Sequence, residues 1–240
     1  MNDVTPATMP TVLAIECSTE TASVAIRSGT RLWTRQVDGV QSHSQSLLPM
    51  VQAVLADAGI KLNQCDAIAF GAGPGSFTGV RTACGVAQGL AYGAGLPVLA
   101  VDTLAAAAQA CHDATGAVAV LAVLDARMGE VYWAQYRFDD GCSVVTAPQL
   151  SVPGSVTPDG PVAVCGNGAA IHADAFRDGA FGGAVRSDLM PHAAQIALLG
   201  QRMFVRGQAV AARDAQPVYL RNNVALTTLE RALAKAESAA

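Results

Sequence analysis

Hydrophobic residues alternate with polar ones early in the chain and then recur at helical spacing. Residues 11–17, 22–27 and 32–37 are rich in β-forming residues, and a Ser-Gly-Thr turn separates the last two segments. These segments predict a meander of three strands. Residues 44–58 then carry leucine and valine at helical spacing, and Gly59 is expected to end that helix.

The next stretch joins a short apolar run to a glycine-rich loop. Residues 67–70 are typical of a buried strand, and glycines interrupt the chain immediately afterwards. A helix over residues 79–94 is expected to follow the loop. A strand over 97–101 and an alanine-rich helix over 103–111 complete the first half.

The second half repeats this order in a degraded form. It predicts strands over residues 117–124, 131–138, 143–146 and 162–165, a proline-rich connection over 148–161, a helix ending near residue 176 and a longer helix over 193–206. A Gly-x-Gly element again separates the late strand from its helix. The pattern therefore indicates an α/β protein with two related halves.

The repeat suggests where the units begin and end. We expect a flexible extension over residues 1–10, an N-terminal domain over 11–112, a C-terminal domain over 113–224 and a tail over 225–240. The helix over 193–206 is a candidate to pack back on the first domain. The extension has neither a basic segment nor an apolar one, which argues against a signal peptide.

Composition narrows the function classes. The chain has 240 residues, 51% hydrophobic and 14% charged, and a net charge of −4 with only two lysines, Lys61 and Lys235. A protein that binds RNA by itself is expected to have a basic face, and the composition of this chain does not indicate one. No apolar run approaches the length of a membrane span, and the six cysteines form no C-x-x-C pair, which favours reduced cysteines in the cytoplasm.

The glycine-rich loop allows two interpretations. Its candidate residues are Gly73, Pro74, Gly75, Ser76, Thr78 and Gly79. Ser76 or Thr78 can cap the following helix, whose N-terminal amides and dipole suit an anion. The standard motifs do not match, since no lysine is nearby, the dinucleotide pattern from Gly71 needs glycine where Ser76 stands, and a nucleophile elbow needs glycine where Pro74 stands. A structural turn and an anion site both remain open.

Four segments together carry a family resemblance. They are GPGSFTGVR at residues 73–81, LAIECST at 13–19, DARMGEVYW at 125–133 and QPVYLRNN at 216–223. They span almost the whole chain and resemble the bacterial TsaB family, formerly YeaZ, which takes part in threonylcarbamoyladenosine modification of transfer RNA.

The resemblance implies a fold and a set of partners. The fold would be that of the actin-like and Hsp70-like ATPases, with two ribonuclease-H-like domains and mixed sheets flanked by helices. The function would be that of a non-catalytic scaffold for the paralogue TsaD, which carries out the transfer to adenosine 37. The ATPase TsaE and the tRNA would be reached through that complex, in the cytoplasm and without membrane contact.

The resemblance also indicates which chemistry is missing. Thr103 and Ala107 stand where the paralogue has two metal-binding histidines, so no metal is expected. Glu16, with Ser18 and Thr19, is either a vestigial nucleotide loop or a loop whose hydroxyls cap local backbone. This chain alone is expected to bind no cofactor, although ATP or ADP could sit at the boundary of the complex.

A charged turn between two predicted strands contains Asp125, Arg127 and Glu130. It could be a hairpin salt-bridge cluster or a partner contact.

Two helices are the expected partner surface. By the resemblance, the helices over 44–58 and 79–94 join two helices of TsaD, or those of a second copy when TsaD is absent, whereas packing against the chain's own core is the alternative. The interface residues expected are Leu47, Met50, Val51, Val54, Val80, Arg81, Cys84 and Gln88. The competing hypothesis is an independent enzyme, either an ATP-dependent transferase or a glycoprotease-like protein.

Overall fold

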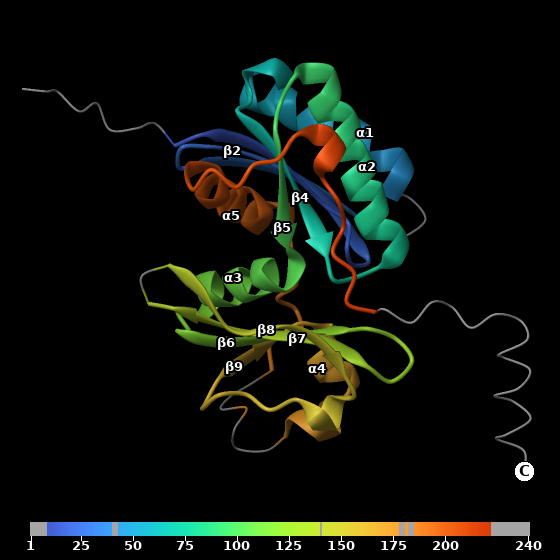
Figure 1. The fold of residues 1–240 in the computed structure, drawn as a ribbon, viewed down its shortest axis with the longest axis vertical. Helices are drawn as coiled ribbons and strands as arrows, with labels where there is room; N and C mark the ends of the chain where they lie inside the picture. Colours follow the sequence, from blue (N-terminus) through green and yellow to red (C-terminus); the bar gives the residue numbers. More distant parts are fainter. Residues whose placement is uncertain (1–8, 40–42, 140, 178–180, 182–184, 222–240) are drawn as a thin grey trace, which may run out of the picture.

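Two sheet-containing halves lie one above the other in this protein (Figure 1). The computed structural model describes residues 9–39, 43–139, 141–177, 181 and 185–221. Most of the expected extension and the whole expected tail over 225–240 lie outside the described residues. Within those residues, no helix is both long and apolar enough to cross a membrane.

The first half contains a five-stranded mixed sheet in the order β3-β2-β1-β4-β5. Its strands are β1 (Thr11–Glu16), β2 (Thr21–Ser28), β3 (Arg31–Asp38), β4 (Ala67–Gly73) and β5 (Val98–Asp102). The first three form the expected antiparallel meander, and Gly29 makes its tight turn at φ +58°. β4 runs parallel to β1, and β5 runs parallel to β4.

Helices cover both faces of this sheet, so the middle of β1, from Val12 to Ile15, is continuously apolar. Leu13 and Ile15 pack with the side that carries α1 and α2, whereas Val12 and Ala14 pack with the side that carries α5. The helices are α1 (His43–Ala58), α2 (Phe77–Ala94) and α5 (Ala193–Val205). α5 therefore covers the first sheet although it follows the second half in sequence.

The second half contains a four-stranded sheet in the order β8-β7-β6-β9. Its strands are β6 (Ala119–Asp125), β7 (Val131–Phe138), β8 (Cys142–Ser151) and β9 (Ala163–Cys165). One face carries α3 (Thr103–Thr115), and the other carries α4 (Asn167–Ile171) with short 3-10 turns at Pro153–Ser155 and Ala173–Phe176. This sheet repeats the first one up to its fourth strand. A single parallel bridge between Cys165 and Arg186 stands where the first half has β5.

α3 and α5 lie between the two sheets and hold the halves together (Figure 1). α3 follows the first sheet in sequence but packs mainly on the second, whereas α5 does the reverse. The two helices touch, and Arg202 of α5 donates to Oε1 of Gln109 on α3 at 3.0 Å. Each half thus contributes its last helix to the other half's sheet.

Two elements differ from the sequence prediction. β8 runs on to Ser151 and includes Pro148, which was expected to lie in a connection. Proline is tolerated there because β8 is the edge strand and needs no amide donor on its outer side. α2 begins at Phe77 rather than at Gly79, because Ser76 caps it by accepting from the Gly79 amide at 3.3 Å.

The close packing of α5 on the first sheet can be tested at Gly200. A Cβ atom at this position would lie 2.9 Å from the Cβ of Ala69, so Gly200→Val should overpack the interface and lower the free energy of unfolding by about 1–3 kcal/mol in urea titrations. As a control, Gly85→Ala on α2 adds a Cβ in open space and should raise it by about 0.5–1 kcal/mol. Equal effects at the two sites would contradict this packing.

Candidate functional site

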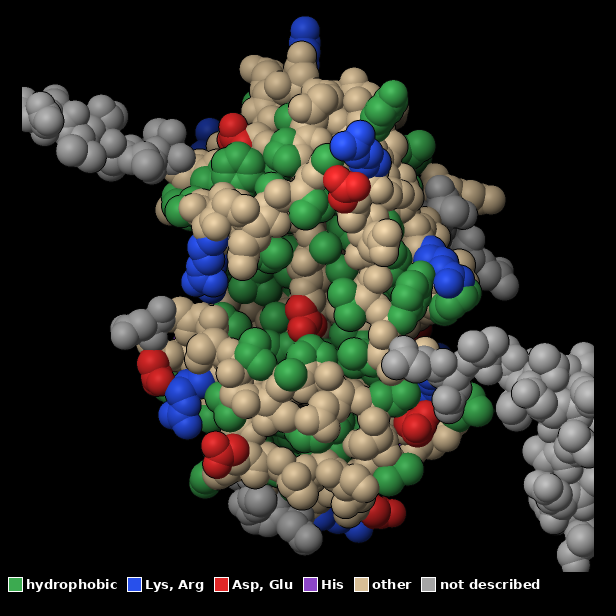
Figure 2. All heavy atoms as spheres, in the orientation of Figure 1, with side chains coloured by type: hydrophobic (Ala, Val, Ile, Leu, Met, Phe, Trp, Pro, Cys, Tyr) green, Lys and Arg blue, Asp and Glu red, His purple; other side chains and the backbone are tan. Residues whose placement is uncertain are grey.

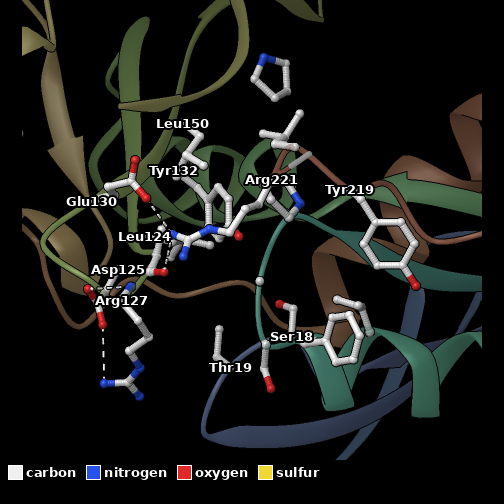
Figure 3. Close-up of a pocket in the computed structure, with 18 of the residues that line it drawn as sticks. Ser18, Thr19, Leu124, Asp125, Arg127, Glu130, Tyr132, Leu150, Tyr219 and Arg221 are labelled. Atoms are coloured by element: carbon white, nitrogen blue, oxygen red, sulfur yellow. Dashed lines mark hydrogen bonds and ion pairs between the residues drawn. The ribbon is translucent and has the colours of Figure 1, made fainter. Parts of the chain in front are cut away.

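A cleft of about 1800 Å³ opens between the two halves, at the carboxyl ends of their central strands. Its first wall comes from residues 18–20 and 74–81, its second from residues 124–132, and residues 218–221 run along its side (Figure 3). Figure 2 shows Lys, Arg, Asp and Glu spread over this face among more numerous uncharged side chains, with no large patch of one sign. The cleft combines both signs of charge rather than one.

The glycine loop is closed by contacts with the β1–β2 loop. The Ser76 amide donates to the carbonyl of Ser18 at 2.7 Å. A Cβ atom on Gly75 would lie 2.6 Å from that same carbonyl oxygen, and one on Gly79 would clash with the carbonyl of Cys17. Gly75 is therefore required by this close approach and not by a positive φ, since the loop's left-handed residue is Gly73 at φ +104°.

Thr103 completes the closure from the other side. Its Oγ1 accepts from the Gly73 amide at 3.1 Å, in a fully buried position. Ala107 is buried one turn further along α3, and its carbonyl accepts from the thiol of Cys165 at 3.5 Å. The two positions where the resemblance places metal-binding histidines in the paralogue therefore have structural contacts here. Among the described residues, no group of three His, Cys, Asp or Glu could hold a metal ion.

Glu16 ends β1 beneath this loop and is fully buried. Its Oε1 accepts from the Ser18 amide, whereas Oε2 has no hydrogen-bond partner among the described residues and lies against the backbone of Gly71. Burial raises the pKa of this carboxyl above its ordinary value near 4.5, against the opposing effect of its hydrogen bonds to residues 17 and 18. The carboxyl is thus covered by the first sheet and does not line the cleft.

The ATPase fold implies a bound nucleotide, and the contacts of the glycine loop show whether the loop could hold its phosphates. The amides of Gly73, Ser76 and Gly79 already donate to protein oxygens. No lysine lines the cleft, and Glu16 cannot reach a metal ion there because it is covered. The residues present do not form a phosphate cradle, so we derive no step through ATP. Thr19 lines the cleft mouth, and its hydroxyl makes a long bond to the Thr21 carbonyl at 3.5 Å.

The opposite wall is a turn held by charged side chains. Arg221 donates through Nη2 to Oε2 of Glu130 at 2.7 Å and to a backbone carbonyl of the turn at 2.9 Å (Figure 3). Arg127 lies 3.3 Å from Asp125 and reaches across the cleft to Glu20 at 3.6 Å. The Arg127–Glu20 pair is exposed and contributes little stability. The structure thus shows contacts within the chain for all three candidates in this turn.

The segment over residues 215–221 binds along α2 and then reaches the second half. The Ala215 carbonyl accepts from Gln88 at 2.9 Å and from the Cys84 thiol at 3.6 Å. The amide of Val218 donates to the carbonyl of Ala72 at 2.8 Å. The hydroxyl of Tyr219 accepts from Nε of Arg81 at 2.8 Å. This segment therefore covers one side of α2.

The expected interface residues are mostly inside the subunit, which corrects the sequence prediction. Five of them pack in the core against the chain's own sheet, namely Leu47, Met50, Val51, Val54 and Cys84. Val80 is also buried, at the wall of the cleft. Gln88 is half-buried under residue 215, so of the eight only Arg81 is exposed. The apolar stripe of an amphipathic helix faces its own core, and the periodicity alone could not show how much of it this sheet covers.

A different set of residues forms the outer face of α1 and α2. These residues are exposed or lie over open space, and they are Gln45, Leu48, Pro49, Gln52 and Ala56 on α1 with Gly85, Gly89, Tyr92 and Gly93 on α2. A Cβ atom on any of the three glycines would meet nothing within 4 Å. Leu48 is 49% exposed and Tyr92 is 84% exposed. The unusual number of glycines in α2 was the sequence signal that could have identified this face.

The fold of the two halves defines the class of protein. Two ribonuclease-H-like halves, each with a meander followed by parallel strands, make this a member of the actin-like and Hsp70-like ATPase superfamily, as the sequence predicted. A family model described as TsaD, tRNA N6-adenosine threonylcarbamoyltransferase, matches residues 35–229.

Comparison with individual proteins narrows this class. The chain is 40% identical over 224 residues to the tRNA threonylcarbamoyladenosine biosynthesis protein TsaB of Escherichia coli, covering 89% of this chain and 96% of that one. It is 37% identical to the TsaB protein of Haemophilus influenzae, over 89% of this chain and 94% of that one. The solved structure of YeaZ from Pseudomonas aeruginosa superposes with a TM-score of 0.82 at 39% identity, covering 88% of this chain and all of that one. The chain belongs to the TsaB family.

The closed loop predicts a structural penalty at Gly75. Gly75→Ala places a methyl group against the Ser18 carbonyl and should lower the free energy of unfolding by about 1–3 kcal/mol in chemical denaturation. The control Gly154→Ala adds a methyl group in open space and should change it by less than about 0.5 kcal/mol. An unchanged stability at Gly75 together with lost tRNA modification would instead indicate a functional anion site.

The buried carboxyl of Glu16 predicts a pH-dependent stability difference. Because the pKa of Glu16 is raised in the folded state, the protonated carboxyl adds to the free energy of unfolding. This contribution is complete below about pH 4.5 and is lost as the pH rises through the folded-state pKa. Glu16→Gln removes this loss, so the variant should gain stability over the wild type as the pH rises from 4 to 8, by about 1.4 kcal/mol per unit of raised pKa. Urea titrations at both pH values measure the gain, and parallel profiles would rule out a raised pKa.

Proposed function

We propose that this protein is a non-catalytic scaffold subunit in the formation of threonylcarbamoyladenosine at position 37 of tRNA. It binds TsaD, supports the transfer that TsaD carries out, and meets TsaE and the tRNA through that complex. The names of its relatives in Escherichia coli and Haemophilus influenzae support a place in this biosynthesis. The closed glycine loop supports the absence of a nucleotide reaction in this chain alone.

The outer face of α1 and α2 carries the proposal. Glycine inside a helix costs about 0.5–1 kcal/mol relative to alanine, so three glycines at positions 85, 89 and 93 cost roughly 1.5–3 kcal/mol. No contact within the described chain requires them, because a Cβ atom would have open space at each one. A benefit outside the chain explains them: small residues allow the backbone of a partner helix to approach closely.

The two helices offer this surface together. α1 and α2 contact each other on the same face of the first sheet, so their outer sides point away from it in one layer. Leu48 adds exposed apolar surface from α1, and Tyr92 adds it from α2. Two helices with these side chains match a pair of helices on the partner, or those of a second copy when TsaD is absent.

An interface variant separates binding from folding. Gly89→Leu fills open space and should leave the isolated chain folded, but it should weaken TsaD binding by about tenfold to a hundredfold, because overpacking an interface costs about 1–3 kcal/mol. Calorimetric titration with TsaD and tRNA modification by the reconstituted complex measure the effect. Normal binding by folded Gly89→Leu would refute this interface.

Two further variants control for general effects. Ala114→Leu changes an exposed position at the end of α3, away from α1 and α2, and should leave both binding and folding intact. Val51→Glu places a charge in the core, where the side chain is only 3% exposed, and should unfold the chain rather than act on the interface alone.

A further inference from the structure

Arg81 is held in a fixed position at the edge of the proposed interface. Its guanidinium carbon lies 3.3 Å from the ring centroid of Phe77 and 5.2 Å from that of Tyr219, and Nε donates to the Tyr219 hydroxyl at 2.8 Å. Phe77 is 60% exposed and Tyr219 is 45% exposed, so the group lies at the surface. The two ring centroids are only 6.2 Å apart, so Phe77 lies against one face of the guanidinium and Tyr219 flanks it beside Nε. The edge with the two terminal nitrogens is left open.

The rest of the chain keeps this arrangement in place. Tyr219 belongs to the segment that is fastened to α2 through the Ala215 carbonyl and to β4 through the Val218 amide. Arg81 itself projects from the second turn of an 18-residue helix. Backbone contacts therefore position the segments that carry Arg81 and Tyr219. Binding then costs these side chains little further conformational entropy.

The two terminal nitrogens of Arg81 have no partner among the described residues. Most arginines in that part of the chain pair with a carboxylate, as Arg35 does with Asp57 and Arg221 does with Glu130. Arg81 forms no such pair, and only its Nε makes a hydrogen bond. A planar guanidinium with a free two-nitrogen edge matches the two oxygens of a carboxylate.

We propose that Arg81, stacked on Phe77 and held at Nε by Tyr219, anchors an aspartate or glutamate side chain of the protein partner. This inference rests on the proposed function, because Arg81 lies one helical turn before Gly85 on the exposed face of α2. Arginine and aromatic residues are the side chains most often found at the energetic centre of protein interfaces. The pair would therefore fix the register of the partner helix against α2.

A protein carboxylate fits this site better than an RNA phosphate. The net charge is −4, and the other two arginines that line the cleft, Arg127 and Arg221, already pair with its acidic side chains, so a polyanion would find no run of unpaired cations there. RNA binding generally requires several cations that track the backbone, whereas one oriented arginine is sufficient for one carboxylate.

The experiment measures TsaD binding at about 50 mM and 300 mM NaCl, because a charge pair near solvent weakens as salt screens it. Arg81→Gln should bind about tenfold more weakly at low salt and lose most of the salt dependence. Arg81→Lys keeps the charge but lacks the planar pair of terminal nitrogens. It should retain the salt dependence but only part of the affinity. Tyr219→Phe keeps the ring and should lose only about two- to fivefold.

Arg31→Gln is the matched control. Arg31 is also exposed and lies over an aromatic ring, 4.6 Å from the centroid of Trp33, but it begins β3 at the end of the sheet away from the glycine loop. This variant should bind like the wild type. Thermal melts of all variants should coincide within a few degrees, because Arg81 and Arg31 are surface residues.

The outcomes separate this inference from the proposed function. If Arg81→Gln binds TsaD like the wild type while Gly89→Leu does not, the carboxylate anchor is wrong and the interface stands. If neither variant changes binding, the proposed interface is wrong as well, and if the wild-type chain does not bind TsaD at all, the proposed function fails. If Arg81→Gln lowers only tRNA retention by the assembled complex, or only self-association of the free chain, then RNA or a second copy is the occupant and the inference is overturned.

Discussion

The contact between the carbonyl of Ser18 and the amide of Ser76 is the constraint on which the rest of the site depends. It brings two loops so close that Gly75 and Gly79 have no room for a side chain. The loop then starts α2 at Phe77, with Ser76 as its cap. The start of α2 fixes where its outer face points and where the segment over 215–221 can attach. The orientation of the outer face of α2 therefore depends on one backbone contact at the wall of the cleft.

This arrangement explains how an ATPase fold can serve as a scaffold. In the first half, the loop amides of Gly73, Ser76 and Gly79 donate to protein oxygens, and the carboxyl of Glu16 is buried. The same helix that closes the loop presents three glycines to open space. Because the N-terminal end of α2 packs against the chain itself, the proposed scaffold role assigns recognition to the outer face of this helix. Contacts between α3 and α5, including the hydrogen bond from Arg202 to Gln109, hold the two halves together.

Local patterns were sufficient to predict most of the fold. A run of β-forming residues identified β1, an apolar run followed by glycines identified β4, and the repeated order of elements indicated two halves. Long-range facts were not accessible in this way. Nothing in residues 103–115 shows that α3 packs on the second sheet, and Pro148 obscured the length of β8 because edge position is a property of the whole sheet. Most residues expected at the interface are buried in the subunit's own core, because periodicity identifies an apolar face but not what covers it.

Hydrogen exchange followed by mass spectrometry tests the central claim most directly, with the protein alone, with ATP and magnesium, and with TsaD. The account predicts that TsaD slows exchange in the described parts of α1 and α2, whereas nucleotide changes nothing in residues 16–20 or 71–80. Protection of those two loops by ATP and magnesium, without protection of α1 and α2 by TsaD, would contradict it. The closed loop would then be an opening nucleotide site, and the outer face of the helices would not be the partner surface.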